Sequence, residues 1–305
     1  SMTRLIFLLT FLAMGCQCGP STTPPKPTTE EPAEQKVDWP TLSSDPDEAR
    51  KQIIERLEKE KGAVVVIHLD DQVLMDRLPR IQRIFTEVMY EAKRQPLMQK
   101  AMRSADHGLK LRSPEAFIEY LGITEEDPLL KLVQRRLKER LVSDAYLSDD
   151  EQRPGSSAFI QEIHGTGAQI VYISSLDFIR SGVGLTRALR VNGYPALGAR
   201  SHLMMRYDAD QSVDDASKQQ LKTIESLGPV AVVFSQSGLL MKDAFPNAYS
   251  VCVLEPGSED PNDSCWSRWS APPPAARVEP NPGVGKELRP LGPPSENSTP
   301  LDAGP

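Results

Sequence analysis

The stretch Ala63-Val64-Val65-Val66-Ile67-His68-Leu69-Asp70-Asp71-Gln72-Val73-Leu74 decides the fold of this 305-residue chain. Its five leading apolar residues follow Lys61-Gly62 and run into a polar cluster. A continuous run of β-branched residues is typical of a strand buried on both faces, as in the centre of a parallel sheet. Ligands of open α/β sheets bind at the carboxyl ends of the strands, so the polar cluster is a candidate site. An ordinary polar loop after a buried strand is the alternative.

Four further segments have the same strand-like character and alternate with helical ones. The strands are predicted at residues 168–175, 201–205, 229–235 and 248–254, and the helices at 157–163, 181–192, 214–227 and 239–245. A helix opened by Asp45-Pro46-Asp47-Glu48 precedes the first strand. Alternating strands and helical crossovers predict an α/β fold: a doubly wound, mostly parallel, five-stranded Rossmann-like sheet. The pair Gly182 and Gly184 is interpreted as the start of a helix.

The segment from Asp76 to Leu141 has helical periodicity and lies between the first two strands. It predicts an α-helical cap inserted into the core. The predicted domains are therefore a signal peptide at 1–15, a Pro/Thr-rich tether at 16–43, the core at 44–76 and 154–269, the cap at 77–153, and a disordered Pro-rich tail at 270–305. The tether is interpreted as a spacer, with a partner-binding tail as the alternative.

The N-terminus has the pattern of an export signal. Arg4 precedes an apolar run from Leu5 to Met14, which is too short to cross a bilayer of about 30 Å as a helix. Gly15 followed by Cys16 resembles the bacterial lipoprotein signal, although Met14 stands where a small residue is usual. The resemblance implies that Cys16 is lipidated and that the chain is an exported, membrane-anchored lipoprotein on the periplasmic face or cell surface. A plain signal peptide cleaved nearby is the alternative.

Charge and cysteine content limit the classes of partner. The chain has 42 acidic and 35 basic residues and a net charge of −7, which argues against a nucleic-acid partner. Cys252 and Cys265 lie in the expected mature body, and exported proteins permit a disulfide between them. In the chain-entropy model, closing such a loop stabilises the fold by about 3 kcal/mol. His107 and His164 are interpreted as surface residues.

The polar groups at the strand ends resemble those of the haloacid-dehalogenase-like (HAD-like) phosphohydrolase superfamily, over about residues 63–254. In that family the first strand ends in Asp-x-Asp, a nucleophile followed by a general acid/base, and these positions read His68-Leu69-Asp70 here. Ser174 matches the hydroxyl residue that holds the phosphoryl group, and Lys218 matches the lysine that neutralises it. Ser235 stands where the family has a magnesium-binding acidic residue. The helical insertion matches the position of the family's cap.

Two replacements weaken the chemistry that the resemblance implies. The family's reaction needs a carboxylate that attacks phosphorus, and His68 occupies that position. Magnesium prefers hard oxygen ligands, whereas imidazole suits zinc, copper or nickel, and Ser235 carries no charge. We therefore expect no cofactor; magnesium is implied only if the site is active after all.

Three other roles remain open for the same residues. Asp70 projects on the same side as His68 if the strand stays extended, so it could take over as the nucleophile. His68 could belong to a metal site with His202, Asp70 or Asp71, although no tight ligand spacing is visible. Ser174, His68 and Asp70 could form a catalytic triad, although nothing resembles a nucleophile elbow.

The sequence thus predicts an exported lipoprotein whose HAD-like fold has lost phosphatase chemistry and serves as a binding or scaffold module. The alternative is a phosphohydrolase with altered or residual phosphomonoesterase activity. A third hypothesis is a binder of a phosphorylated or anionic small ligand that uses Lys218, Ser174 and strand-end amides without turnover. The membrane, through a lipid on Cys16, is the other expected partner, and the sequence names no protein partner.

Overall fold

The computed structural model describes residues 41–70, 72–104, 113–236, 244–256, 258, 265, 266 and 269. The chain divides into two units, Ser1–Pro40 and Thr41–Pro305, and all described residues belong to the second. The expected signal peptide with Cys16, the expected tail, Asp71 and His107 lie outside the described residues. Within them, no helix combines the length and the apolar character that crossing a bilayer requires.

A five-stranded sheet forms the centre of the described unit, with strand order β5-β4-β1-β6-β7. Every pairing within it is parallel. The strands are β1 (Val64–His68), β4 (Gln169–Asp177), β5 (Ser201–Arg206), β6 (Val230–Ser235) and β7 (Tyr249–Cys252). The valine-rich strand lies in the middle, as its two-sided burial requires. The predicted Rossmann-like α/β fold is confirmed.

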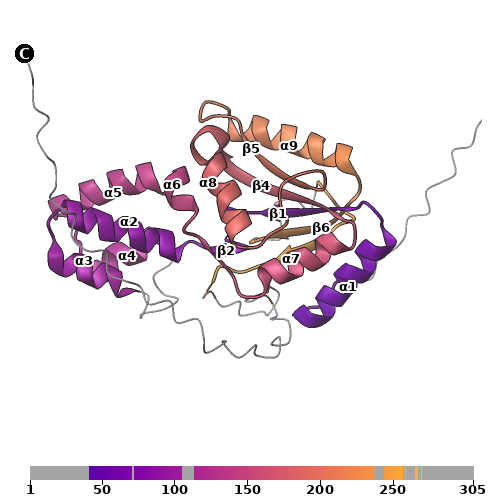
Figure 1. Ribbon diagram of the computed structural model, residues 1–305, viewed down its shortest axis with the longest axis horizontal. Coiled ribbons are helices and arrows are strands. Elements are labelled where there is room, and N and C mark those ends of the chain that lie inside the picture. Colours follow the sequence, from indigo (N-terminus) through magenta and orange to yellow (C-terminus); the bar gives the residue numbers. More distant parts are fainter. Residues whose placement is uncertain are drawn as a thin grey trace, which may run out of the picture. The chain divides into compact units, whose positions relative to one another are not determined.

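Helices cover both faces of the sheet (Figure 1). They are α1 (Pro46–Lys59), α7 (Ser156–Gly165), α8 (Phe178–Val191) and α9 (Val213–Leu227). Neighbouring residues of a strand point to opposite faces, and β6 illustrates this. Val233 packs in the cluster that includes Ile224 of α9, whereas the Phe234 ring lies 6.3 Å from the ring of Phe159 on α7. The sheet is therefore the middle layer of a three-layer core.

The segment between β1 and β4 is helical, as its periodicity predicts. It contains α2 (Leu78–Glu91), α3 (Gln95–Met102), α4 (Pro114–Leu121), α5 (Pro128–Arg140) and α6 (Asp144–Leu147), which we call the cap helices. They bury an apolar core of their own, in which Phe85 stacks on Phe117 with ring centroids 4.8 Å apart. The two chain segments that join them to the sheet pair as a short antiparallel ribbon, β2 (Met75–Asp76) with β3 (Glu151–Gln152). Two-residue strands are too short for a sequence pattern to predict.

Helix α8 differs from its prediction. It begins at Phe178, because the Asp177 side chain accepts from the backbone N–H of Arg180 at 3.0 Å and caps the helix. Gly182 and Gly184 therefore lie inside the helix and do not start it. A Cβ at Gly184 would lie 2.5 Å from the backbone oxygen of Asp144, so glycine is required where α8 meets α6. The helix predicted at 239–245 falls mostly outside the described residues, and its last two residues are not helical.

Candidate functional site

The side chain of Asp70 is held by the end of the neighbouring strand. Its Oδ1 accepts from Ser174 Oγ at 2.5 Å, and its Oδ2 accepts from the backbone N–H of Ser175 at 2.5 Å. The Ser174 hydroxyl in turn accepts from the N–H of Leu176 at 3.1 Å. These contacts arise because β1 and β4 are adjacent and parallel, so that their carboxyl ends meet at one edge of the sheet.

A cavity of about 220 Å³ opens beside Asp70. Half of the residues that line it are apolar, and the polar half contains two carboxylates, two guanidinium groups, two serines and a glutamine. The lining residues are Leu69, Asp70, Gln72, Met75, Arg77, Arg80, Leu141, Val142, Leu147, Asp150, Ser174, Ser175, Leu176 and Leu185. Its walls therefore come from the strand ends, from α8 and from the cap segment.

An ion pair of low exposure forms part of the cavity wall on the cap side. Arg80 Nε lies 3.0 Å from Asp150 Oδ1, and both side chains are more than nine-tenths buried. Neither atom makes a hydrogen bond to a described residue, because the N–H does not point at the carboxylate. Arg80 is held by its other nitrogen, Nη1, which donates to the carbonyl of Leu141 at 2.6 Å.

Burial dominates the electrostatics of this pair. It raises the pKa of Asp150 to about 7, against the lowering effect of Arg80 and then of Arg77. Burial also lowers the pKa of the Arg80 guanidinium, and the negative charge of Asp150 partly offsets this lowering. A buried donor and a buried acceptor that face a cavity without hydrogen bonds are the kind of groups that water or a ligand satisfies.

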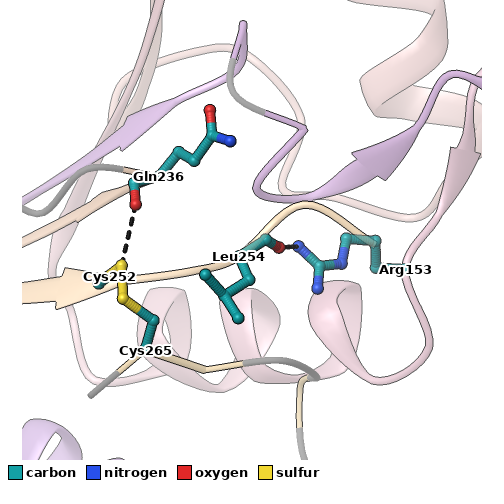
Figure 2. The surroundings of a disulfide bond; sticks show 5 residues. All are labelled: Arg153, Gln236, Cys252, Leu254 and Cys265. Carbon is teal, nitrogen blue, oxygen red and sulfur yellow. Dashed lines mark hydrogen bonds between the residues drawn. A yellow bond between two sulfur atoms is a disulfide. The ribbon is translucent and has the colours of Figure 1, made fainter. Parts of the chain in front are cut away.

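The loop after Asp70 is fixed by side chains that donate hydrogen bonds to its carbonyl oxygens. Arg153 Nη1 donates to the carbonyl of Gln72 at 3.2 Å and to that of Leu254 at 2.6 Å. Trp269 Nε1 donates to the carbonyl of Val73 at 2.8 Å. Figure 2 shows the Arg153 guanidinium directed at the carbonyl of Leu254, two residues after Cys252 in the sequence. The loop that carries the site is thereby tied to the C-terminal part of the described chain.

The predicted cysteine pair is present as a disulfide between Cys252 and Cys265. Cys252 is the last residue of β7, and its sulfur contacts the backbone oxygen of Gln236 at 2.9 Å (Figure 2). Gln236 directly follows β6 and Ser235. The disulfide thus lies at the same edge of the sheet as the candidate site, at the end of β7.

The structure brings together some of the residues that the sequence singled out. Asp70 and Ser174 share a hydrogen bond and line the cavity. His68 ends β1 and is half-buried, and Ser235 ends β6 and is buried, but neither is among the described residues that line the cavity. Lys218 lies on the exposed side of α9 and is not among them either. Its role as a phosphate ligand, like that of Ser174, stays a prediction.

Sequence reasoning missed the polar groups that the cap segment contributes. Arg77 and Arg80 stand at the start of α2, and Asp150 lies within an acidic run, Asp149-Asp150-Glu151, that resembles a solvated surface. No local pattern shows that Arg80 and Asp150, 70 positions apart in sequence, would meet inside the fold. One weak signal was available, because Arg80 precedes Ile81 at the apolar face of a strongly amphipathic helix.

The described residues do not fit a magnesium site of the kind that the resemblance implies. No group of three His, Cys, Asp or Glu side chains among them is placed to hold a metal ion. The Asp70 carboxylate already accepts hydrogen bonds at both oxygens. Ser235 offers only a hydroxyl, and magnesium sites use carboxylate or phosphate oxygens. We therefore derive no step through a metal ion.

Comparison with known proteins gives structural likeness alone. No protein-family model and no curated protein matches the chain. It is similar to a crystal structure from Thermotoga maritima described as a beta-phosphoglucomutase, with 15% identity, a TM-score of 0.38, and 67% of this chain and 92% of that chain covered. It is also similar to CbbY from Rhodobacter sphaeroides in complex with phosphate, with 17% identity, a TM-score of 0.34, and 64% and 86% covered. At these values the likeness concerns the fold, and nothing about activity follows from it.

Proposed function

We propose that this chain is an exported, lipid-anchored binding module with a HAD-like core. In this proposal the cavity beside Asp70 holds a small ligand, and the chain does not transfer phosphoryl groups. The observation that carries the proposal is the hydrogen bonding of the Asp70 carboxylate. Both of its oxygens accept hydrogen bonds from the end of β4, so the carboxylate is part of the wall of a binding cavity.

The hydrogen bonds at Asp70 oppose a catalytic role. A carboxylate nucleophile attacks through an oxygen lone pair, and two short hydrogen bonds from the protein lower the reactivity of both oxygens. His68 and Ser235 stand at the positions where the resemblance implies a nucleophile and a metal ligand. Removing a catalytic nucleophile costs on the order of 10⁶ in rate, or roughly 8 kcal/mol of transition-state stabilisation.

The charges around the cavity favour an anionic ligand. Arg77 and Arg80 contribute two positive charges and Asp70 contributes a carboxylate; Glu255, 4.0 Å from Arg77, does not line the cavity. Burial raises the pKa of Asp150 to about 7, so this second carboxyl is largely neutral below that pH. The wall then carries an excess positive charge in mildly acidic conditions. The cavity of about 220 Å³ is smaller than the roughly 300–1,000 Å³ of common small-molecule sites, so the ligand is small.

Two features support the exported location in the proposal. The lipoprotein-like sequence around Cys16 implies a lipid anchor, and the disulfide between Cys252 and Cys265 suits an oxidising compartment. Treatment of bacterial cells with a radiolabelled fatty acid tests the anchor. Label should enter the wild-type chain and be absent from the Cys16→Ala variant, with Cys18→Ala as the matched control that keeps the label.

Turnover assays test the loss of phosphatase chemistry. The wild type is assayed with a panel of phosphomonoesters and added magnesium, beside Asp70→Asn and the double variant His68→Asp with Ser235→Asp. We expect no turnover by the wild type above a heat-denatured control. Turnover that disappears in Asp70→Asn would show that Asp70 acts in catalysis and would replace the proposal with the altered phosphohydrolase.

Anion binding is tested by thermal unfolding at millimolar inorganic phosphate near pH 6. We expect phosphate to stabilise the wild type and Arg83→Gln, because Arg83 pairs with Glu87 and Asp149 and does not line the cavity. The stabilisation should be lost in Arg77→Gln, whose guanidinium does line it. Loss in Lys218→Ala with retention in Arg77→Gln would instead place the anion at the position that the sequence predicted.

A further inference from the structure

One helix of the sheet core presents an apolar stripe to solvent. On α8 the side chains of Phe178, Ile179, Val183 and Val191 are between 53% and 61% exposed. Nine large hydrophobic residues are exposed among the described residues, and these four lie on this single helix of 14 residues. Such a concentration marks an interaction surface, because scattered exposed apolar residues are normal and clustered ones are not.

The stripe belongs to a helix that the fold holds in place. Leu185, Ala188 and Leu189, on the side of α8 opposite Ile179 and Val183, are buried, and Gly184 donates its N–H to Asp144 Oδ1 at 2.5 Å. The helix therefore cannot rotate its outer apolar residues into the core. No described residue covers Ile179 and Val183, which are 61% and 59% exposed.

The same outer face is basic. Arg180, Arg187 and Arg190 are exposed, and residues 178–191 contain no Asp or Glu, although the whole chain carries a net charge of −7. Arg180 pairs with Asp177 at 2.7 Å. Arg187 and Arg190 form no ion pair with any described residue. Spacings of three and four residues align Ile179, Val183, Arg187 and Arg190 along one side of the helix.

We propose that the outer face of α8 lies on a membrane surface that contains anionic lipids. Arg187 and Arg190, which pair with no residue in the described part of the chain, complement anionic headgroups, and long arginine side chains keep their charge at the interface while their stems contact apolar material. Ile179, Val183 and Val191 enter the boundary between headgroups and acyl chains, as in helices that lie in the membrane plane. This contact goes beyond the proposed binding cavity and does not depend on it.

The acidic loop at one end of the helix limits the extent of the contact. Tyr207 and Phe178 line the same hollow of about 410 Å³, and Asp208 and Asp210 follow Tyr207 in the sequence. These carboxylates are repelled by anionic headgroups. The contact therefore runs from Ile179 toward Val191, with Asp208 and Asp210 at its rim.

A reporter on α8 tests the contact in the full chain. Cys16 and Cys18 are replaced by serine, and a polarity-sensitive fluorophore is attached to Val183→Cys or, as a control, to Gln134→Cys on the exposed side of α5. Vesicles of phosphatidylcholine with phosphatidylglycerol should shift the emission of the dye at position 183 to the blue, and added salt should reverse the shift. The leader is the same in both proteins, so it cannot produce the difference. Equal responses at the two positions would overturn the proposal.

Paired arginine variants test the role of charge. Replacing Arg187 and Arg190 by glutamine should weaken binding to the anionic vesicles by about thirtyfold, given ~1 kcal/mol for each basic residue near an anionic surface. The matched control replaces Arg135 and Lys138, which are exposed, also three residues apart, and on α5. Equal weakening by the two pairs would overturn the proposal, since only net charge would then matter. An equal shift with pure phosphatidylcholine vesicles would also overturn it.

Discussion

The hydroxyl of Ser174 donates to Oδ1 of Asp70 across 2.5 Å and ties the end of β4 to the loop after β1. These two residues are 104 positions apart in sequence, yet the parallel pairing of β1 with β4 places them at the same edge. Together with the N–H of Ser175, the hydroxyl fixes the orientation of the carboxylate before any ligand arrives. The fold itself therefore sets the polar side of the cavity.

The first prediction concerns this hydrogen bond. In Ser174→Ala, Asp70 loses one of its two donors and the N–H of Leu176 loses its acceptor, both close to a buried position. We expect the free energy of unfolding to fall by about 1–3 kcal/mol, as measured by urea denaturation at neutral pH. Ser175→Ala is the matched control, because the contact of Ser175 with Asp70 uses its backbone, and its effect should stay within about 0.5 kcal/mol. Equal losses in the two variants would contradict the assigned role of the Ser174 hydroxyl.

The second prediction concerns the buried pair of Arg80 and Asp150. Burial raises the pKa of Asp150 from 3.8 to about 7, so the folded chain keeps a proton that the unfolded chain has released. Stability contributed by this group is complete below about pH 4, falls as the pH rises, and is lost above about pH 7. A shift of this size corresponds to a loss on the order of 4 kcal/mol, with Arg80, Arg77, Asp76 and Asp149 as the facing charges.

Urea unfolding between pH 4 and pH 8 tests this linkage. In Asp150→Asn the side chain has no proton to release, so the free energy of unfolding should lose the decrease that the wild type shows. Asp149→Asn is the control, because Asp149 pairs with the more exposed Arg83 and should leave the pH dependence of Asp150 in place. A profile for Asp150→Asn that parallels the wild type would assign the pH dependence to another group.

The fold could be predicted because its elements have strong local signals. The continuous run of valines in β1 has apolar side chains on both sides of the strand, so both faces have to be buried. The polar residues that follow it lie at the carboxyl edge of the sheet. Ser174 was singled out by the resemblance to the HAD-like family, and its contact with Asp70 became visible only in the structure, where β1 and β4 are adjacent and parallel.

The rest of the site depends on contacts that no local pattern carries. Arg80 and Asp150 meet only because the two connections to the cap helices run side by side as β2 and β3. The side of a helix that faces a site is set by packing; Lys218 is exposed on α9 and does not line the cavity, and its role as a phosphate ligand stays a prediction. The residue that makes glycine necessary at position 184 is Asp144, which is 40 positions away in sequence. The sequence therefore does not show this contact, and the glycine pair alone indicates only a helix start.

The third prediction tests the close approach at Gly184. An added Cβ would lie 2.5 Å from the oxygen and 2.6 Å from the Cα of Asp144, and these are backbone atoms that cannot rotate away. Gly184→Ala should therefore lower the free energy of unfolding by about 1–3 kcal/mol, although alanine favours a helix. Gly165→Ala in α7 meets nothing within 4 Å and should be neutral or stabilising by up to ~1 kcal/mol. A stabilised Gly184→Ala variant would show that α6 and α8 are not in close contact.

The fourth prediction concerns the disulfide between Cys252 and Cys265. The bond closes a loop of 13 residues, for which the chain-entropy model gives about 3 kcal/mol. The double variant Cys252→Ser with Cys265→Ser should lose about this much in urea unfolding, and a reducing agent should destabilise the wild type but not the variant. Cys265 lies four residues before Trp269, whose indole N–H donates to the carbonyl of Val73. Loss of the disulfide should therefore also change the tryptophan emission of the folded state.

Replacing Cys16 and Cys18 by serine is the control and should leave both the stability and the emission unchanged. If the reducing agent destabilised the double variant as strongly as the wild type, the effect could not come from this bond.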